Sequence, residues 1–218
     1  GGGFSPISLT PSAWWRLNDG AGTTAVDSSG NGYDLTLTNT PTWITGHNGG
    51  ALNFAAASSE KGETAAAGLR TALQGLTAFT VAFWARASAY GLQSAALAIR
   101  NGVDAGALLA IYPYDGDPTN GARVFFSGDN VLKGTEVSVD TWHHFAVVQR
   151  SSTDRELFVD NVSQDTDTTA KTLPATLSHV KVGAWNGGQF YNGDIDEPII
   201  VPRALTDAEL TNLYQWAG

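Results

Sequence analysis

The chain has 218 residues, a formal charge of −9 and no cysteine. The acidic balance argues against a nucleic-acid partner, because a phosphate backbone would be repelled, and the lack of cysteine excludes disulfides, thiol catalysis and Cys-ligated zinc. No apolar run approaches the roughly 18 residues of a membrane helix, so we expect no membrane insertion.

Short strands dominate the predicted elements. We expect an extended lead-in over residues 1–12 and a single domain over residues 13–218, since all-β domains often reach this length. Segments with apolar and polar residues in alternation predict strands, and Asn-Gly, Asp-Gly and Asp-Asn pairs between them predict turns. Their regular spacing predicts an all-β fold, a two-sheet antiparallel sandwich. The predicted strands are Ala13–Leu17, Leu35–Thr38, Ala51–Phe54, Phe79–Arg86, Ala95–Arg100, Ala107–Tyr112, Ala122–Ser127, His143–Gln149, Glu156–Val159, Val180–Ala184 and Ile199–Val201.

Two segments have helical character. Residues 55–75 are rich in Ala, Gly and Ser and predict a loop with a short helical turn around Leu69–Leu73. Near the end of the chain, Thr206 and Glu209 have the spacing of a capping box, and Leu205 and Leu210 that of a hydrophobic staple. The sequence therefore predicts a short C-terminal helix over Asp207–Trp216, packed on the sandwich.

The loop Asp27–Gly32 has oxygen-bearing side chains at alternate positions and glycine at the sixth, like the first half of a calcium loop. Calcium requires six to eight oxygen ligands. The position of the last EF-hand ligand is Thr38 and not glutamate, so the loop is no EF-hand and needs ligands from elsewhere. A plain Asx turn explains the same residues.

A second acidic group follows at Asp194-Ile195-Asp196-Glu197. On a strand, Asp194 and Asp196 share one face and Glu197 takes the other. Glycosidases need two carboxylates on either side of one bond, so this parity argues against catalysis here. Pro198 predicts an edge or an irregular strand, because proline cannot donate to a β-ladder.

Aromatic residues in polar loops are the candidate ligand contacts, because sugar faces stack on rings while hydroxyls meet polar side chains. The loop at residues 185–191 is the best candidate, whereas for the loop with Tyr112 and Tyr114 we favour a turn whose tyrosines cover the sheet edge over one that presents them to a ligand. No serine lies in a G-x-S-x-G motif, and the four histidines lack metal-ligand spacing. His143 and His144 face opposite sides of a strand. The candidate residues are Tyr112, Tyr114, Trp185, Phe190 and Tyr191.

Several separated segments together resemble the laminin G-like, concanavalin A-like jelly-roll family. Each segment is weak alone, but they follow the family's order over about residues 13–215. The opening residues 4–11 before Trp14-Trp15 also resemble the lead-in of such domains in bacteriophage structural proteins. The matching segments are Asp27–Gly32, Gly49–Phe54, Phe79–Trp84, Thr141–Val147, Leu157–Asn161, Tyr191–Glu197 and Arg203–Thr206.

This resemblance implies a jelly roll and a calcium ion that joins the early loop to the late acidic segment. Carried over, the side-chain ligands are Asp27 and Asp196, with Asn31 nearby. The leading hypothesis is a non-catalytic domain, outside the cell or on a virion surface, that binds a glycan or a protein surface. The alternatives are a virion structural protein with capsid or tail subunits as partners, and a glycosidase or polysaccharide lyase on the same fold.

Overall fold

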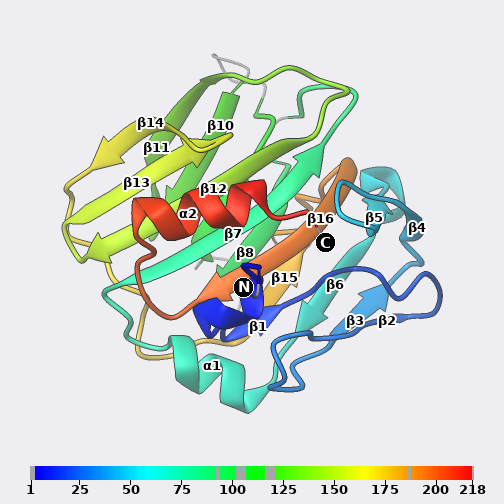
Figure 1. Cartoon of the computed structure of the whole chain (residues 1–218), viewed down its shortest axis with the longest axis horizontal. Coiled ribbons are helices and arrows are strands. Elements are labelled where there is room, and N and C mark those ends of the chain that lie inside the picture. Colours follow the sequence, from blue (N-terminus) through cyan, green and yellow to red (C-terminus); the bar gives the residue numbers. More distant parts are fainter. Residues whose placement is uncertain (1–2, 92–93, 102–106, 116–120, 186–187, 218) are drawn as a thin grey trace.

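The computed structural model describes residues 3–91, 94–101, 107–115, 121–185 and 188–217, which form two antiparallel sheets (Figure 1). The first sheet contains β1 (Ala13–Trp14), β4 (Thr42–Thr45), β5 (Gly50–Phe54), β7 (Phe79–Arg86), β12 (His143–Ser151), β13 (Asp154–Val159), β14 (Val162–Asp167) and β16 (Gly193–Val201). Its order is β14-β13-β12-β7-β16-β5-β4, and β1 pairs with β16.

The second sheet contains β2 (Thr24–Ala25), β3 (Leu35–Thr38), β6 (Lys61–Thr64), β8 (Leu97–Arg100), β9 (Ala107–Tyr112), β10 (Gly121–Phe126), β11 (Asp129–Glu136) and β15 (His179–Val182). Its order is β11-β10-β9-β8-β15-β6-β3-β2. The chain changes sheet at each step from β5 to β8, as a jelly roll requires. The predicted all-β sandwich is therefore confirmed.

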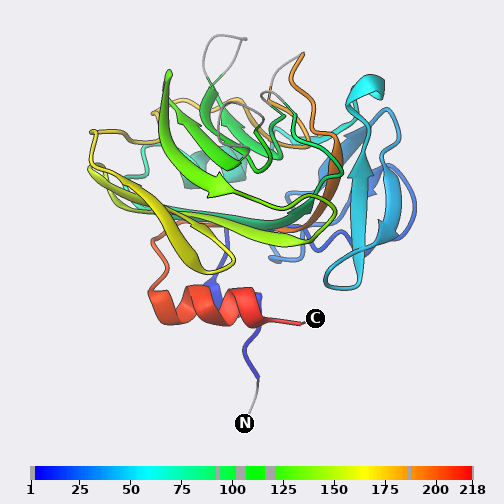
Figure 2. The same cartoon turned by 90° about the horizontal axis from the view of Figure 1, so that it is seen from above.

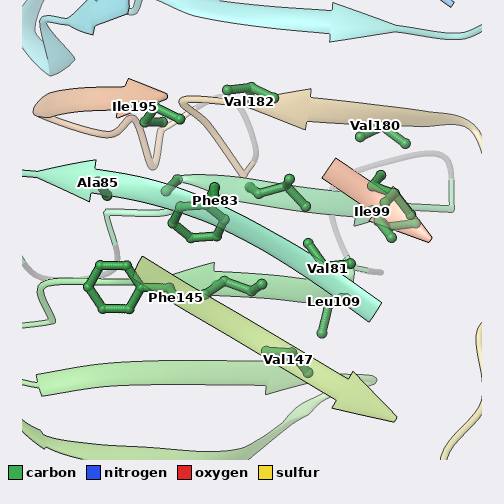
Figure 3. Close-up of a cluster of buried hydrophobic side chains, with 14 of the residues drawn as sticks. Val81, Phe83, Ala85, Ile99, Leu109, Phe145, Val147, Val180, Val182 and Ile195 are labelled. Carbon is green, nitrogen blue, oxygen red and sulfur yellow. The ribbon is translucent and has the colours of Figure 1, made fainter. Parts of the chain in front are cut away.

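The main core lies between the sheets, because each strand turns alternate side chains inward. Phe83 of β7 stacks on Phe145 of β12 with ring centroids 5.7 Å apart. Ile99 and Leu109 approach from the second sheet, and all four are buried (Figure 3). Burial of one such side chain contributes about 1.5–3 kcal/mol, so this layer supplies most of the apolar stabilisation.

A second apolar cluster covers the outer face of the first sheet. The helix α2 (Asp207–Gln215) lies across this face, and both chain ends are on the same side (Figure 2). Leu210 and Leu213 of α2 pack on Ala82 and Val148 of the sheet. The capping box between Thr206 and Glu209 is present, as predicted. The other helices are the 3-10 turns η1 (Pro6–Leu9) and η2 (Ala56–Ser58) and the helix α1 (Ala67–Leu73). None of the described helices is long and apolar enough to span a membrane.

Five of the described strands were not expected from the sequence: β2, β4, β6, β11 and β14. In β14 the side chains are exposed or half-buried along its whole length, so it has no buried face to produce an alternating pattern. It forms because it pairs with β13 across a tight turn. Its strand conformation therefore depends on a partner, which hydrophobic periodicity does not report.

Pro198 lies in a central strand and not at an edge. β16 runs between β7 and β5, and its register with β7 shifts between Asp196 and Ile199. This β-bulge contains Pro198, whose missing N–H is therefore not needed by the ladder. Its carbonyl accepts a hydrogen bond from the backbone N–H of Trp15 at 2.9 Å. The sequence predicted either an edge strand or an irregular strand at Pro198, and the structure has the irregular strand.

His144 is buried on the outer face of the first sheet, against Trp84 and Tyr214. Burial lowers the pKa of its imidazole to about 4. In the unfolded chain the pKa is near 6.5, so between about pH 6.5 and 4 the unfolded state binds a proton that the folded state does not. We therefore expect the free energy of unfolding to fall on acidification, by up to about 1.4 kcal/mol per pH unit from this group.

The variant His144→Phe tests this expectation. Urea unfolding of both proteins between pH 7.5 and 4.5 should show a shallower decline for the variant. Carboxylates take up protons in both proteins alike on acidification, so their contributions cancel in the difference. Parallel pH profiles would contradict the assignment.

Candidate functional site

A polar pocket opens where β5, β7 and β16 meet at one end of the first sheet. Its volume is about 410 Å³. The walls combine charged side chains, amides and backbone. The lining residues are Asn53, Phe54, Ala55, Arg86, Ala87, Ser88, Asp140, Asn192, Gly193 and Asp194.

Strand register places the three central side chains of this pocket side by side. Asp194 of β16 lies opposite Arg86 of β7 and opposite Asn53 of β5. The Asn53 amide donates to Asp194 Oδ1 at 2.7 Å, and Arg86 donates from Nε and a terminal nitrogen to Oδ2 at 2.8 and 2.7 Å. Both carboxylate oxygens are thus engaged. The charge-assisted contacts fix the side chains before a ligand arrives.

Arg86 is the exposed member of this group, with 37% of its side chain accessible against 10% for Asp194. Its guanidinium stacks over the half-buried Trp142 at 5.0 Å from the ring centroid. The stacking holds a flexible side chain in place. Gly193 permits the close approach of β16, because a Cβ there would lie 2.5 Å from the Arg86 carbonyl oxygen. The pocket therefore offers donors and acceptors in fixed positions, with its central charges paired.

Two of the predicted aromatic contacts, Tyr114 and Tyr191, pack beside this pocket and bind the backbone of β7. Tyr114 and Tyr191 are buried, so neither has the exposure that a ligand contact needs. Their hydroxyls donate to the carbonyls of Ala85 and Arg86 at 3.1 and 3.3 Å. Both line a cavity of about 60 Å³ that shares Ala87 with the polar pocket. Burial raises the pKa of the Tyr191 hydroxyl, which stays a neutral donor to the backbone.

Two of the remaining aromatic candidates, Tyr112 and Trp185, belong to an apolar cluster on the outer face of the second sheet. Tyr112 is buried there, so it also lacks the exposure that a ligand contact needs. The half-buried Trp185 packs on Tyr112 and Phe125, with centroid distances of 6.0 and 5.0 Å. Phe190 is half-buried and its backbone pairs with Ala184. The loop tip at residues 186–187, part of the predicted contact, lies outside the described residues. The structure thus divides the five candidates between two regions.

The predicted calcium ligands of the early loop have protein partners. Asp27 accepts backbone N–H groups of Trp14, Ser29 and Tyr33 and the Ser29 hydroxyl, at 2.8–3.1 Å. The Asn31 amide nitrogen donates to the carbonyls of Pro11 and Ser12. These contacts form an Asx-type turn, and the bond from Trp14 joins this turn to β1.

Asp196 has a different environment. Its side chain is fully buried; Oδ2 accepts the Asn48 N–H at 2.8 Å, and Oδ1 has no partner among the described residues. Gly46 packs closely against this carboxylate, because a Cβ there would lie 2.6 Å from Asp196 Oδ2 and 2.4 Å from the Gly50 carbonyl oxygen. The Asp196 carboxylate and the Gly50 carbonyl oxygen therefore lie close together beside Gly46, where only glycine fits.

Glu197 adds a second buried carboxylate beside it. Its left-handed backbone, with φ of 53°, belongs to the β-bulge and directs the side chain to Trp14 Nε1 at 2.5 Å and Arg16 at 3.4 Å. Burial raises the pKa of Asp196 to about 7, and burial together with the Asp196 charge raises that of Glu197 to about 8. For both carboxylates, the cost of removing the charged form from water therefore exceeds the stabilisation that nearby hydrogen bonds and positive charges give it.

This arrangement fits a hard cation, which takes carboxylate and carbonyl oxygens. Among the described residues, no three His, Cys, Asp or Glu side chains group together as a metal site. A cation here would instead use Asp196 with backbone oxygen. The β-bulge sets the directions of the Asp196 and Glu197 side chains. Pro198 is the only residue in the sequence that indicated an irregularity there.

The comparisons with known proteins agree on the fold. Residues 61–211 match the family model described as the concanavalin A-like lectin/glucanases superfamily. No curated protein matches the chain. Domain 4 of AbnA, an extracellular arabinanase from Geobacillus stearothermophilus solved with arabinotriose, is similar at 16% identity with a TM-score of 0.73, over 94% of this chain and 98% of that domain.

Two further solved structures are similar. The Trypanosoma rangeli sialidase matches at 14% identity and a TM-score of 0.69 over 93% of this chain, which spans only 32% of the sialidase. The binding domain of Paraclostridial Mosquitocidal Protein 1 matches at 15% identity and a TM-score of 0.67, over 94% of this chain and 52% of that one. At these identities the likeness establishes the fold.

Proposed function

Because the chain belongs to the concanavalin A-like lectin/glucanase superfamily, we propose that it is a non-catalytic recognition domain that binds a glycan in the Arg86–Asp194 pocket. The observation that carries this proposal is the prearranged row of Asn53, Asp194 and Arg86 at the mouth of a polar pocket. Such a row suits sugar hydroxyls, which both donate and accept hydrogen bonds. The similar arabinanase domain was solved with a bound oligosaccharide.

The ligand chemistry follows from the charge of the pocket. Arg86 and Asp194 neutralise each other, and the nearby Asp140 and Asn192 are exposed. A neutral oligosaccharide therefore pays no penalty for uncompensated charge, whereas an acidic one meets Asp140. Adjacent hydroxyls of one ring can bridge a guanidinium N–H and an amide or carboxylate oxygen. We expect neutral pentose or hexose oligosaccharides to bind more tightly than acidic ones.

The variant Arg86→Ala is the direct test. It removes charged donors from the pocket and leaves Asp194 without its cation, so we expect affinity for the bound glycan to fall about 10- to 100-fold, equivalent to roughly 1.5–3 kcal/mol. Binding would be measured by glycan array, then by calorimetry on the best oligosaccharide, with arabinotriose included as a probe.

A matched control is available on the same sheet. Arg150 pairs with Glu156 at 2.7 Å, with 34% and 15% of the side chains exposed, close to the values for Arg86 and Asp194. Arg150→Ala should leave binding unchanged. If Arg86→Ala binds like the wild type while Trp185→Ala does not, the glycan site lies on the second sheet and this proposal is wrong.

We also propose that a structural calcium ion binds at Asp196, with the Gly50 carbonyl as a second ligand. Three observations support this position: Asp196 Oδ1 has no partner in the described part of the chain, the Gly50 carbonyl oxygen lies close to the same carboxylate, and both acids have raised pKa values. The ion would supply positive charge to a buried carboxylate and join β16 to the turn at residues 46–50. Asp27 and Asn31 stay predicted ligands from the resemblance, but the site proposed here does not use them, because their present contacts would first have to be exchanged for metal bonds.

An extracellular or particle-surface location follows from the proposed function, since glycans are displayed there and the similar arabinanase is described as extracellular. A virion structural role stays an alternative prediction.

A glycosidase or polysaccharide lyase activity is the second alternative prediction. The polar pocket includes Asp194 but not Glu197, which is engaged by Trp14 and Arg16, so the two acids do not face one cleft.

A further inference from the structure

A chain of hydrogen bonds joins a serine, a histidine and an aspartate near the end of the first sheet. Ser138 Oγ lies 2.8 Å from His143 Nε2, and His143 Nδ1 lies 2.6 Å from Asp160 Oδ2. These residues have no part in the glycan pocket or the Asp196 site. Their connectivity is that of a nucleophile, a general base and the group that orients the base.

Three separate elements hold this arrangement. Ser138 lies in the connection between β11 and β12, and His143 begins β12. Asp160 lies in the turn between β13 and β14, where its φ of 49° is left-handed. Its second oxygen accepts the backbone N–H of His144 at 2.9 Å. The His144 N–H thus fixes the Asp160 carboxylate, and the carboxylate in turn orients the His143 imidazole.

The protonation pattern follows from the partners. An ionised carboxylate only accepts hydrogen bonds, so the neutral imidazole carries its proton on Nδ1 toward Asp160. The lone pair on Nε2 is then free to accept the Ser138 hydroxyl proton. A neutral imidazole in this tautomer can remove that proton as the oxygen attacks an electrophile.

A ligand can reach the serine. Ser138 is exposed, while 14% of the His143 side chain and 34% of the Asp160 side chain are accessible. All three line one pocket of about 410 Å³, with Val159 and Val162 in its wall. Val162 is one of the few exposed large apolar side chains of the described chain, at 60%. This apolar wall beside the hydroxyl suits a short acyl chain.

We propose that Ser138 is an activated nucleophile that accepts short acyl groups from esters. Ser138 Oγ attacks the ester carbonyl carbon while its proton passes to His143 Nε2. The bond to the alcohol oxygen breaks, the alcohol leaves with that proton, and the acyl group remains on Ser138. Water then gives a proton to His143 and attacks the acyl carbon, releasing the carboxylic acid and restoring the serine.

A fluorophosphonate is the probe, because it forms a stable bond to an activated serine oxygen and releases fluoride. We expect intact-protein mass spectrometry and peptide mapping to show one adduct, on Ser138. Ser163 is the matched control: it is exposed on the neighbouring β14 and forms no hydrogen bond with a histidine of the described chain. Ser138 should be labelled about 100-fold faster than Ser163, since general-base assistance typically contributes about 10²–10⁴-fold.

Variants complete the test. Ser138→Ala should lose the adduct and the release of nitrophenol from p-nitrophenyl acetate, whereas Ser163→Ala should retain both. Asp160→Asn should slow labelling because the wrong tautomer is favoured, and its melting curve would show whether it still folds. Equal labelling of Ser138 and Ser163, or ester cleavage that persists in Ser138→Ala, would mean that the three residues only brace the loop, and the proposal would fail.

Discussion

Calcium is expected to raise the free energy of unfolding of the wild-type protein, and Asp196→Asn is expected to abolish that rise. A ligand that binds only the folded state stabilises it by about 2.7 kcal/mol at 100 times its Kd and about 4.1 kcal/mol at 1,000 times. Thermal unfolding in excess calcium and in excess chelator measures the increment. For a domain of this size it corresponds to a rise of several degrees in Tm, at about 2–4 °C per kcal/mol.

The sign of the variant's effect should depend on calcium. In chelator, the wild type carries a buried carboxylate with a partnerless oxygen, whose charge is costly to bury. Asparagine has no charge, so Asp196→Asn should be as stable as the wild type or more stable. With calcium, the variant should be the less stable protein. A purely structural role for Asp196 would give the same difference in both buffers.

Asp27→Asn is the control that separates the two candidate loops. Asp27 accepts four hydrogen bonds from protein donors, so its replacement should destabilise the protein at any calcium concentration and leave the increment intact. The opposite result, with the increment lost in Asp27→Asn and kept in Asp196→Asn, would place the ion in the early loop and overturn the proposed site.

Replacement of Arg155 by Met should lower the free energy of unfolding by about 3–5 kcal/mol, the range for breaking a buried ion pair by removal of one partner. The Arg155 side chain has no accessible surface and forms an ion pair with Asp167. It also donates to Gln149 Oε1 at 3.1 Å and to the carbonyls of Ser152 and Thr169 at 2.8 Å. Methionine fills the space but leaves these acceptors without donors.

Urea unfolding of Arg155→Met and Arg150→Met measures the contrast. Arg150 makes an ion pair with Glu156 while a third of its side chain is exposed, and exposed pairs contribute about 0–1 kcal/mol. The difference between the two variants therefore isolates the effect of burial. If both variants lose the same free energy of unfolding, the buried Arg155 network contributes no more to stability than an exposed ion pair.

The sequence by itself determined the features that depend on local chemistry. The capping box of Thr206 and Glu209 is satisfied within one helical turn, so its residues suffice to predict it. The alternation in Phe79–Trp84 likewise predicts a strand with both faces covered, and both are buried. The ordered set of such segments indicated the jelly roll, and part of the chain matches that family.

Only the tertiary structure decided which side chains face a ligand. Tyr112, Tyr114 and Tyr191 stand in polar loop sequences, yet all three are buried because other parts of the fold cover them. The row of Asn53, Asp194 and Arg86 comes from three strands paired in a register that long-range packing sets. The bulge at Glu197 likewise needs its partner strand to exist. Local hydrogen bonding can be read along the chain, whereas burial and cross-strand proximity arise only once distant segments are paired.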